Sequence, residues 1–319
     1  MTSRTLLLAL LLVILAAVPW FVHSGYLLHV MILIFLNVML ATSMWLLGIT
    51  HLISFGQAGF MFIGAMTSAL LTKDLGISFW LALPVAGVLP ALIAAPVGRL
   101  SLRVRGVYFF LVTLAFGEVV RGVFAYFQVP FGGWYGVRDI PPPSPRWLFT
   151  PLDKVAFYYL GLVLVVLTCW VIRRISRSWF GEVLWSIRES ELLAASVGID
   201  VLGHKLVAFI ISAFVAGLAG SFYANYVGYI SPLIFDFQYS VSILIFVVVG
   251  GFASLAGPLA GAVVLTIIPE VFRASGKYQM LIFGLILMVS VMTMPDGIVG
   301  ALQRLKLRRL HARRGQRPA

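Results

Sequence analysis

Apolar runs long enough to cross a bilayer recur along this chain of 319 residues, and most of its charged residues lie between them. A hydrocarbon core about 30 Å thick is crossed by roughly 20 apolar residues in a helix. Only 11% of the residues are charged and 61% are hydrophobic, whereas soluble domains carry charges on about a quarter of their residues. The sequence therefore predicts an all-α fold, a polytopic helical membrane protein. It lacks the alternating segments of about ten residues that a transmembrane barrel requires.

Hydropathy predicts about ten spans, with eight as the lower bound. The predicted spans are Thr5–Val22, Tyr26–Ile49, Ile53–Leu71, Phe79–Val97, Val107–Phe127, Ala156–Ile172, Leu206–Val227, Tyr239–Gly250, Pro258–Phe272 and Gln279–Met294. The segment ending at Gly250 is short for a span, which indicates a broken or re-entrant helix covered by protein or water. A cleaved signal peptide is the alternative for the first span, but no clear small-residue cleavage site precedes Pro19.

Basic residues set the predicted orientation. With the N-terminus inside, the alternation of spans places Arg99–Arg105, Arg173–Lys205 and the C-terminal cations on one side, as the positive-inside rule requires. Both termini are therefore predicted to be cytoplasmic. A transmembrane domain covers residues 1–300 and a basic cytoplasmic tail covers residues 301–319. The formal net charge of +12 follows this topology, so we expect these cations to meet membrane lipid and not nucleic acid.

The longest polar interruption, residues 173–205, is predicted to be a cytoplasmic loop built around a helix that meets a partner protein. Apolar residues recur there at helical spacing, small residues follow, and Gly198 can adopt the left-handed backbone that ends a helix. An amphipathic helix on the membrane surface is one interpretation, but surface anchoring favours bulky apolar residues. A short helix that enters a partner's groove fits better. The residues that we assign to this coupling are Arg188, Glu191, Ala194, Ala195 and Gly198.

Two segments broken by glycine indicate where a polar solute could cross. Such breaks at matching places in the two halves of a membrane protein point to a midplane site. Packing of helices through small residues is the alternative, although a glutamine is costly to leave without partners. The candidate path residues are Ser54, Gly56, Gln57, Gly59, Gly250 and Gly251.

Glu118 and Arg121 are the main ionisable residues inside a predicted span. Their spacing places them on one helix face, and charges in lipid are expensive unless they are paired or functional. We predict an intramembrane ion pair with a structural role, and solute contact is the alternative. The predicted extracytoplasmic loop, residues 128–155, is rich in glycine and proline. It is interpreted as an irregular cap, with a docking surface or lid as the alternative.

Catalytic residues are not predicted. The chain has no phosphate-binding loop, nucleophile elbow or paired catalytic carboxylates, so it cannot hydrolyse ATP itself. His51 and His204 have no second ligand at metal spacing, so no metal is predicted. The single cysteine, Cys169, allows no internal disulfide.

Five long motifs in a fixed order are a specific signal. They are ISFGQAGFMFIGAMTSALL at 53–71, RVRGVYFFLVTLAFGEVVR at 103–121, GEVLWSIRESELLAASVGIDVLGHKLVAFIISAFVAGLAGSFYA at 181–224, FVVVGGFASLAGPLAGAVVL at 246–265 and MPDGIVGAL at 294–302. Over nearly its whole length, the chain resembles the LivM-type permease subunits of the branched-chain amino-acid ABC importers. A match of several motifs in order is much stronger than one short match.

This resemblance implies a permease subunit in the bacterial inner membrane, with no cofactor of its own because ATP is bound by partner subunits. The implied partners are two ABC ATPase subunits, a second, LivH-like permease subunit and an extracytoplasmic solute-binding protein. By the same resemblance Glu182–Asp200 includes the coupling helix that docks on an ATPase subunit. Gly198 matches the glycine of the family's EAA signature, whose first three letters are replaced here by Leu192, Leu193 and Ala194.

Two departures from the family pattern bear on the solute. The chain has Gly56-Gln57-Ala58 where the family often has Gly-His-Ala, and FGGWYG at 131–136 where it often has TGGSDG. The implied solutes are branched-chain or related amino acids. An ABC permease for urea, short amides or other small solutes is the alternative. An ion-coupled secondary transporter is a further one, disfavoured because it calls for more ionisable groups inside the bilayer.

Overall fold

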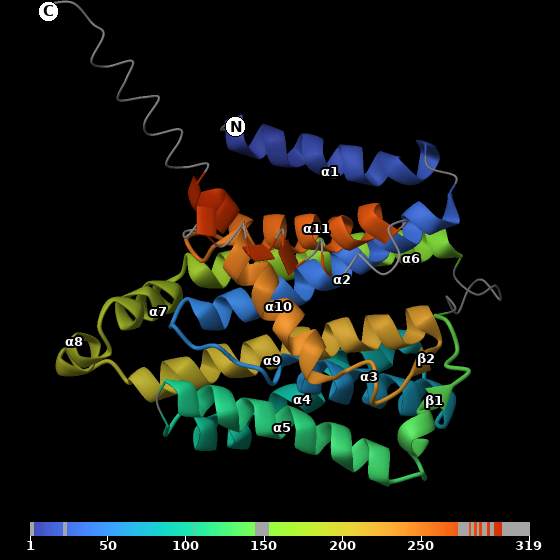
Figure 1. The fold of residues 1–319 in the computed structure, drawn as a ribbon, viewed down its shortest axis with the longest axis horizontal. Coiled ribbons are helices and arrows are strands. Elements are labelled where there is room, and N and C mark those ends of the chain that lie inside the picture. The colour runs from blue at the N-terminus through green and yellow to red at the C-terminus, as the bar shows by residue number, and fades with distance from the viewer. Residues whose placement is uncertain are drawn as a thin grey trace, which may run out of the picture.

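The computed structural model describes residues 3–21, 24–104, 106–143 and 153–273, and several short pieces between 281 and 301. Its elements are α1 (Ser3–Phe21), α2 (Gly25–Gly48), α3 (Gln57–Lys73), α4 (Phe79–Ser101), α5 (Val107–Tyr126), the 3-10 helix η1 (Gly133–Tyr135), β1 (Val137–Arg138), α6 (Lys154–Ser176), α7 (Trp179–Glu189), α8 (Glu191–Ser196), α9 (Val201–Val227), β2 (Tyr229–Ile230), α10 (Phe237–Gly250) and α11 (Ala256–Val271). In Figure 1 the long helices form one bundle, with α1 along one edge and α5 along the opposite edge.

Hydropathy and helix length fit a membrane bundle. Among the described residues, α2, α4, α5, α6 and α9 are each long and apolar enough to cross a membrane. Shorter apolar helices occupy Leu12–Phe21, Phe237–Gly250 and Ala256–Val271. A helix satisfies its own backbone hydrogen bonds in lipid, so the prediction of a helical membrane protein is confirmed. The number of spans and the side of the termini stay predictions. The predicted span Gln279–Met294 and the tail 301–319 lie largely outside the described residues.

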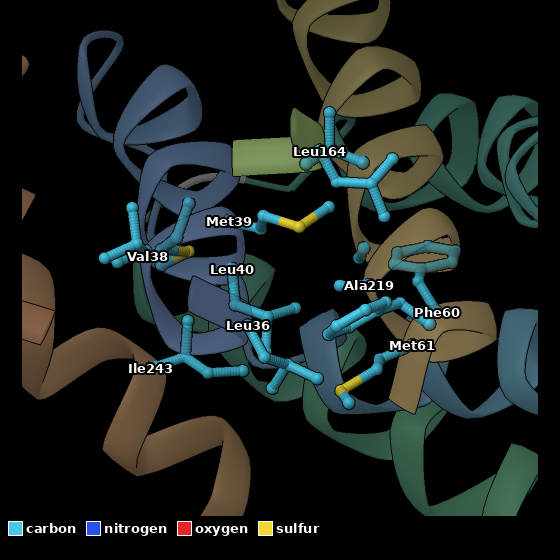
Figure 2. Packing of buried hydrophobic residues seen from close by; sticks show 14 of the residues in the cluster. Leu36, Val38, Met39, Leu40, Phe60, Met61, Leu164, Ala219 and Ile243 are labelled. Carbon is cyan, nitrogen blue, oxygen red and sulfur yellow. The ribbon is translucent and has the colours of Figure 1, made fainter. Parts of the chain in front are cut away.

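The centre of the bundle is α2. In its most apolar window, 78% of the residues are buried inside the chain. Figure 2 shows side chains of α2 facing those of α3 and α9, with α6 and α10 adding to the same cluster; the labelled residues are Leu36, Val38, Met39, Leu40, Phe60, Met61, Leu164, Ala219 and Ile243. Because lipid tails are as apolar as leucine, these helices are held together by close packing and polar contacts, not by a hydrophobic driving force.

Close backbone approach holds α9 against α3 and α4, its two most extensive neighbours. Gly217 of α9 faces Gly64 of α3 and the backbone of α4. A Cβ at Gly217 would lie only 2.7 Å from Pro90 Cγ and 3.2 Å from Gly87 Cα. Glycine at this position therefore allows three helix backbones to meet, which larger side chains would keep apart.

The two ends of the bundle differ. The short helices α7 and α8 project from one end, and the β1–β2 ribbon lies at the other (Figure 1). The ribbon is antiparallel, with Val137 opposite Ile230 and Arg138 opposite Tyr229. It lies partly within the predicted irregular loop 128–155, so a small strand pair interrupts that loop. Lys73 Nζ donates to the Arg138 carbonyl at 2.7 Å, which fastens the ribbon to the end of α3.

Several predicted boundaries are wrong by a few residues. The helix predicted from Ile53 begins at Gln57, because Phe55 N donates to Thr113 Oγ1 at 3.1 Å and Gly56 N to Ser54 Oγ at 3.2 Å. The predicted polar loop 173–205 narrows to residues 177–200, since α6 runs to Ser176 and α9 starts at Val201. The Asp200 carboxylate accepts from Gly203 N at 3.0 Å and so caps the early start of α9. Likewise, α6 begins at Lys154, inside the predicted loop 128–155.

Candidate functional site

Two helices, α7 and α8, form the projecting loop where the sequence pattern suggests one. Ser190 separates them, with φ −162° and ψ 114°. Its extended backbone ends α7, and its hydroxyl accepts from Leu193 N at 3.3 Å to cap α8. Serine is favoured at such a position because its side chain replaces a missing backbone partner. The loop is therefore a helical hairpin with a fixed corner.

Gly198 ends α8 as the sequence indicates. Its φ is +86°, in the left-handed region. Gly198 N donates to the Ala195 carbonyl at 3.0 Å and Ile199 N to the Ala194 carbonyl at 3.1 Å. This pair of bonds is the Schellman arrangement, in which a left-handed residue turns the chain away from the helix. The chain then runs directly into the cap of α9.

A buried lysine braces α8 against α9. Lys205 Nζ of α9 donates to Glu191 Oε1 of α8. The lysine side chain is 9% exposed and that of the glutamate is 47% exposed. Removing the acid would strand a desolvated cation, which costs more than the pair itself contributes. Glu191, which the sequence assigns to coupling, thus also ties the projecting loop to the bundle.

The hairpin has an inner and an outer face. Val183, Ile187 and Ala194 form a small apolar cluster, with Ile199 and Val201 packed against it. On the outer face the apolar side chains are exposed, at 81% for Leu192, 68% for Leu193 and 75% for Val197. Ala195 and Gly198 are also exposed. Apolar residues held at the tip of a braced hairpin are typical of a docking surface.

Arg188 is the one predicted coupling residue on α7. Its Cζ lies 5.1 Å from the centroid of the Trp185 ring, within cation–π range. Its Nη1 is buried and makes no hydrogen bond within the described part of the chain. The guanidinium is therefore held on this side of α7 by its contact with Trp185, and the coupling role of Arg188 stays a prediction.

The first predicted path segment is fully buried. Ser54, Gly56, Gln57 and Gly59 are all buried. Gln57 Nε2 donates to Ser212 Oγ at 2.6 Å, which links α3 to α9, while Gln57 Oε1 has no partner among the described residues. A Cβ at Gly59 would lie 3.1 Å from Gly117 Cα, so this glycine brings α3 and α5 together. These contacts support packing, and the path role stays a prediction.

The second predicted path segment closes the hairpin between α10 and α11. Gly250 and Gly251 are both buried, and Gly251 ends α10 with φ +98°. The Gly250 backbone lies against Gly257 and Pro258 of α11. Nearby, Trp45 Nε1 donates to the Phe252 carbonyl at 3.0 Å. The first segment packs on α5 and α9 and the second on α11 and α2. They share α10 as a neighbour, because Ser240 of α10 donates to the Phe55 carbonyl at 2.8 Å and accepts from Ala58 N at 3.3 Å.

Glu118 and Arg121 contact each other on α5. Arg121 Nη2 lies 2.6 Å and Nε 2.9 Å from Glu118 Oε2. The side chains are partly exposed, at 40% for Glu118 and 27% for Arg121. Within the described residues, neither makes a hydrogen bond to another helix. A structural role would favour a pair that joins two helices, and this pair does not join α5 to another helix of the described chain.

Sequence reasoning missed the exposed leucines of α8 and the partners Lys205 and Ser212. Lys205 was predicted only as a cation that sets topology, although Ser190 before Glu191 is a recognisable start signal for a second helix. Ser212 lies on a different helix from Gln57, so no local pattern could connect them. The described residues hold no group of three histidine, cysteine or acidic side chains that could bind a metal ion.

Together, the bundle of apolar helices and its projecting hairpin of α7 and α8 define a helical membrane protein. The chain belongs to the family described as branched-chain amino acid transport system / permease component, whose model matches residues 26–291. It is 34% identical to the high-affinity branched-chain amino acid transport system permease protein LivM of Salmonella typhimurium, over 93% of this chain and 75% of that protein.

Two further relatives extend this similarity. Identity to the LivM protein of Escherichia coli is 33%, with the same coverage. Identity to the probable branched-chain amino acid transport permease protein LivH of Methanocaldococcus jannaschii is 26%, over 82% of this chain and 87% of that protein. No solved structure matches the chain. The family and the apolar helices make this a multi-pass permease of the bacterial inner membrane.

Proposed function

We propose that this chain is one permease subunit of an ATP-driven importer for branched-chain or related amino acids. Two ABC ATPase subunits would bind ATP on the cytoplasmic side, and a related, LivH-like permease would complete the membrane part. An extracytoplasmic binding protein would deliver the solute. The names of the LivM and LivH relatives support the solute class and the second permease. The end with α7 and α8 is then cytoplasmic, in agreement with its basic flanks.

The observation that carries the proposal is the exposed apolar surface of α8, a helix that is fastened to α9 by an ion pair. Leu192, Leu193 and Val197 face outward, and the bond between Glu191 and Lys205 connects α8 to α9. Since α9 packs along α3 and α4, a displacement of α8 would be passed to the bundle as a movement of packed helices. Bistable packing of this kind transmits a local shift over a distance.

Leu193→Asp tests the docking surface. The Leu193 side chain is exposed, so a charge there should leave the subunit folded and inserted while it weakens binding of the ATPase. The matched control is Leu233→Asp, an exposed leucine near the start of α10. We expect loss of ATPase co-purification and of amino-acid uptake for Leu193→Asp alone. Full co-purification and full uptake by this variant would refute docking through α8.

The solute and the energy source need a separate test. Proteoliposomes with the complete complex should accumulate leucine only with its binding protein outside and ATP inside. Uptake driven by an ion gradient without ATP would instead support the secondary-transporter alternative. Uptake of urea or short amides in place of leucine would support the other ABC alternative.

A further inference from the structure

The partly exposed charged pair on α5, Glu118 and Arg121, is the feature that the proposed function leaves unexplained. By the helix rise, Glu118 lies about 16 Å from the start of α5 and about 12 Å from its end. It is therefore well inside the span and not at a bilayer surface. Only 11% of the most apolar window of α5 is buried in this chain, and the side chains of Glu118 and Arg121 are 40% and 27% exposed, so this chain does not enclose the pair.

Lipid is an unfavourable environment for the side chains of Glu118 and Arg121. Charged side chains inside a bilayer almost always face protein or a water-filled cavity, because hydrocarbon cannot solvate them. Glu118 Oε2 accepts both bonds from Arg121. The second carboxylate oxygen and the remaining guanidinium donors therefore have capacity for a further polar ligand. Val119 and Val123, which point further around the helix from the pair, are apolar and suit lipid.

We propose that Glu118 and Arg121 line the solute passage between this chain and the second permease, where they contact a zwitterionic α-amino acid in transit. This inference rests on the proposed function and deepens it. The ligand's ammonium group would lie beside the Glu118 carboxylate and its carboxylate beside the Arg121 guanidinium. Both the pair and the ligand are neutral overall, so binding leaves no net charge in the membrane. A cationic or anionic solute at this place would leave a net charge in the membrane.

Space beside the pair supports a ligand. Gly122 follows Glu118 by four residues and so shares its helix face. A Cβ added at Gly122 would have no atom of the described chain within 4 Å. Ala115, three residues before Glu118, is also small and exposed. The face thus combines a charged pair with room for an aliphatic side chain.

Cysteine labelling tests access while keeping the pair intact. In a Cys169→Ser background, Gly122→Cys and Val123→Cys occupy consecutive positions and point about 100° apart around the helix. The assembled complex is treated with a membrane-impermeant methanethiosulfonate and, separately, with the lipid-soluble N-phenylmaleimide. We expect the impermeant reagent to label residue 122 and not residue 123, and leucine with its binding protein and ATP to slow that labelling several-fold.

Three labelling outcomes would overturn the proposal. Equal labelling at the two positions would mean that water does not distinguish them. No labelling at residue 122 by either reagent would place the face in a dry contact with the second permease. Labelling that leucine does not slow would leave a wet surface without a solute site.

A second measurement separates solute contact from folding. Glu118→Gln and Arg121→Gln should assemble in the membrane in normal amounts but lose most leucine uptake per assembled complex. Glu118→Asp should keep part of the leucine uptake, because it retains the carboxylate. The control is Glu270→Gln, which removes the acid of another pair, Glu270 and Arg273, three residues apart at the end of α11. Uptake that falls only with the amount of assembled complex would refute the solute contact. Failure of the wild-type complex to take up leucine would instead refute the proposed function.

Discussion

The helices α2 and α5 are both apolar enough to cross a membrane, with mean hydropathy of 2.3 and 1.7, yet they are used in opposite ways. In the most apolar window of α2, 78% of the residues are buried inside this chain, against 11% for α5. Hydropathy reports that a helix lies in the membrane. It does not report which of its sides meet protein, because lipid and protein interiors are equally apolar. The open side of α5 is thus left for lipid, water or a second subunit.

The largest expected contrast is between two leucines. Leu40 of α2 is fully buried and Leu111 of α5 is 47% exposed. Leu40→Ala should lower the free energy of unfolding by about 2–5 kcal/mol, because it leaves a cavity in packed surroundings. Leu111→Ala should change it by less than about 0.5 kcal/mol in the isolated subunit. Thermal unfolding of the two purified variants measures this difference. Equal losses would show that α5 is as enclosed as α2.

Gly217 of α9 and Gly122 of α5 allow the same comparison between an enclosed and an open helix face. Gly217→Ala should destabilise the subunit by about 1–3 kcal/mol, since the added methyl overpacks the contact of α9 with Pro90 and Gly87. Gly122 lies on the open face of α5. Gly122→Ala should stabilise the helix by about 0.5–1 kcal/mol, because alanine loses less backbone entropy than glycine on folding. Midpoints of thermal unfolding decide the signs. A stable Gly217→Ala variant would contradict the close approach of α9 and α4.

The helix α8 extends the comparison to a surface outside the bundle. Gly198→Val should cost about 1–3 kcal/mol locally, because valine resists a positive φ. We expect normal membrane insertion but weaker co-purification with the ATPase subunits. Gly198→Asn is the matched control, since asparagine tolerates the left-handed region and should retain binding. Equal ATPase binding by the valine variant would show that the end of α8 is not part of the docking surface.

The smallest effect concerns Gln57 on the closed side of α3. Gln57→Leu removes the bond to Ser212 and should cost roughly 1 kcal/mol, as for other hydrogen bonds between membrane helices. If the residue only packs helices, leucine uptake should fall in proportion to folded complex, measured by quantitative immunoblot. If it lines a passage, uptake should fall with assembly and basal ATP hydrolysis unchanged. The second result would confirm the path role predicted from the sequence.

The sequence by itself determined the class of this protein. Repeated apolar runs require helices in a membrane, since only helices and closed barrels satisfy the backbone there. Local chemistry also predicted the left-handed turn at Gly198 and the spacing that lets Glu118 reach Arg121, because both depend on residues close in the chain. The family motifs added the transport role.

Only the tertiary structure decided which sides of these helices are closed. Ser212 accepts a hydrogen bond from Gln57 although the two residues are 155 positions apart in the sequence. Lys205 of α9 donates to Glu191 of α8, just after the corner at Ser190. No local pattern encodes such contacts, because glycine, serine and alanine look alike whether they face a neighbouring helix or an open space. The burial of the path glycines and the exposure of the pair on α5 follow from how α2, α3 and α9 pack together, which only the assembled bundle fixes.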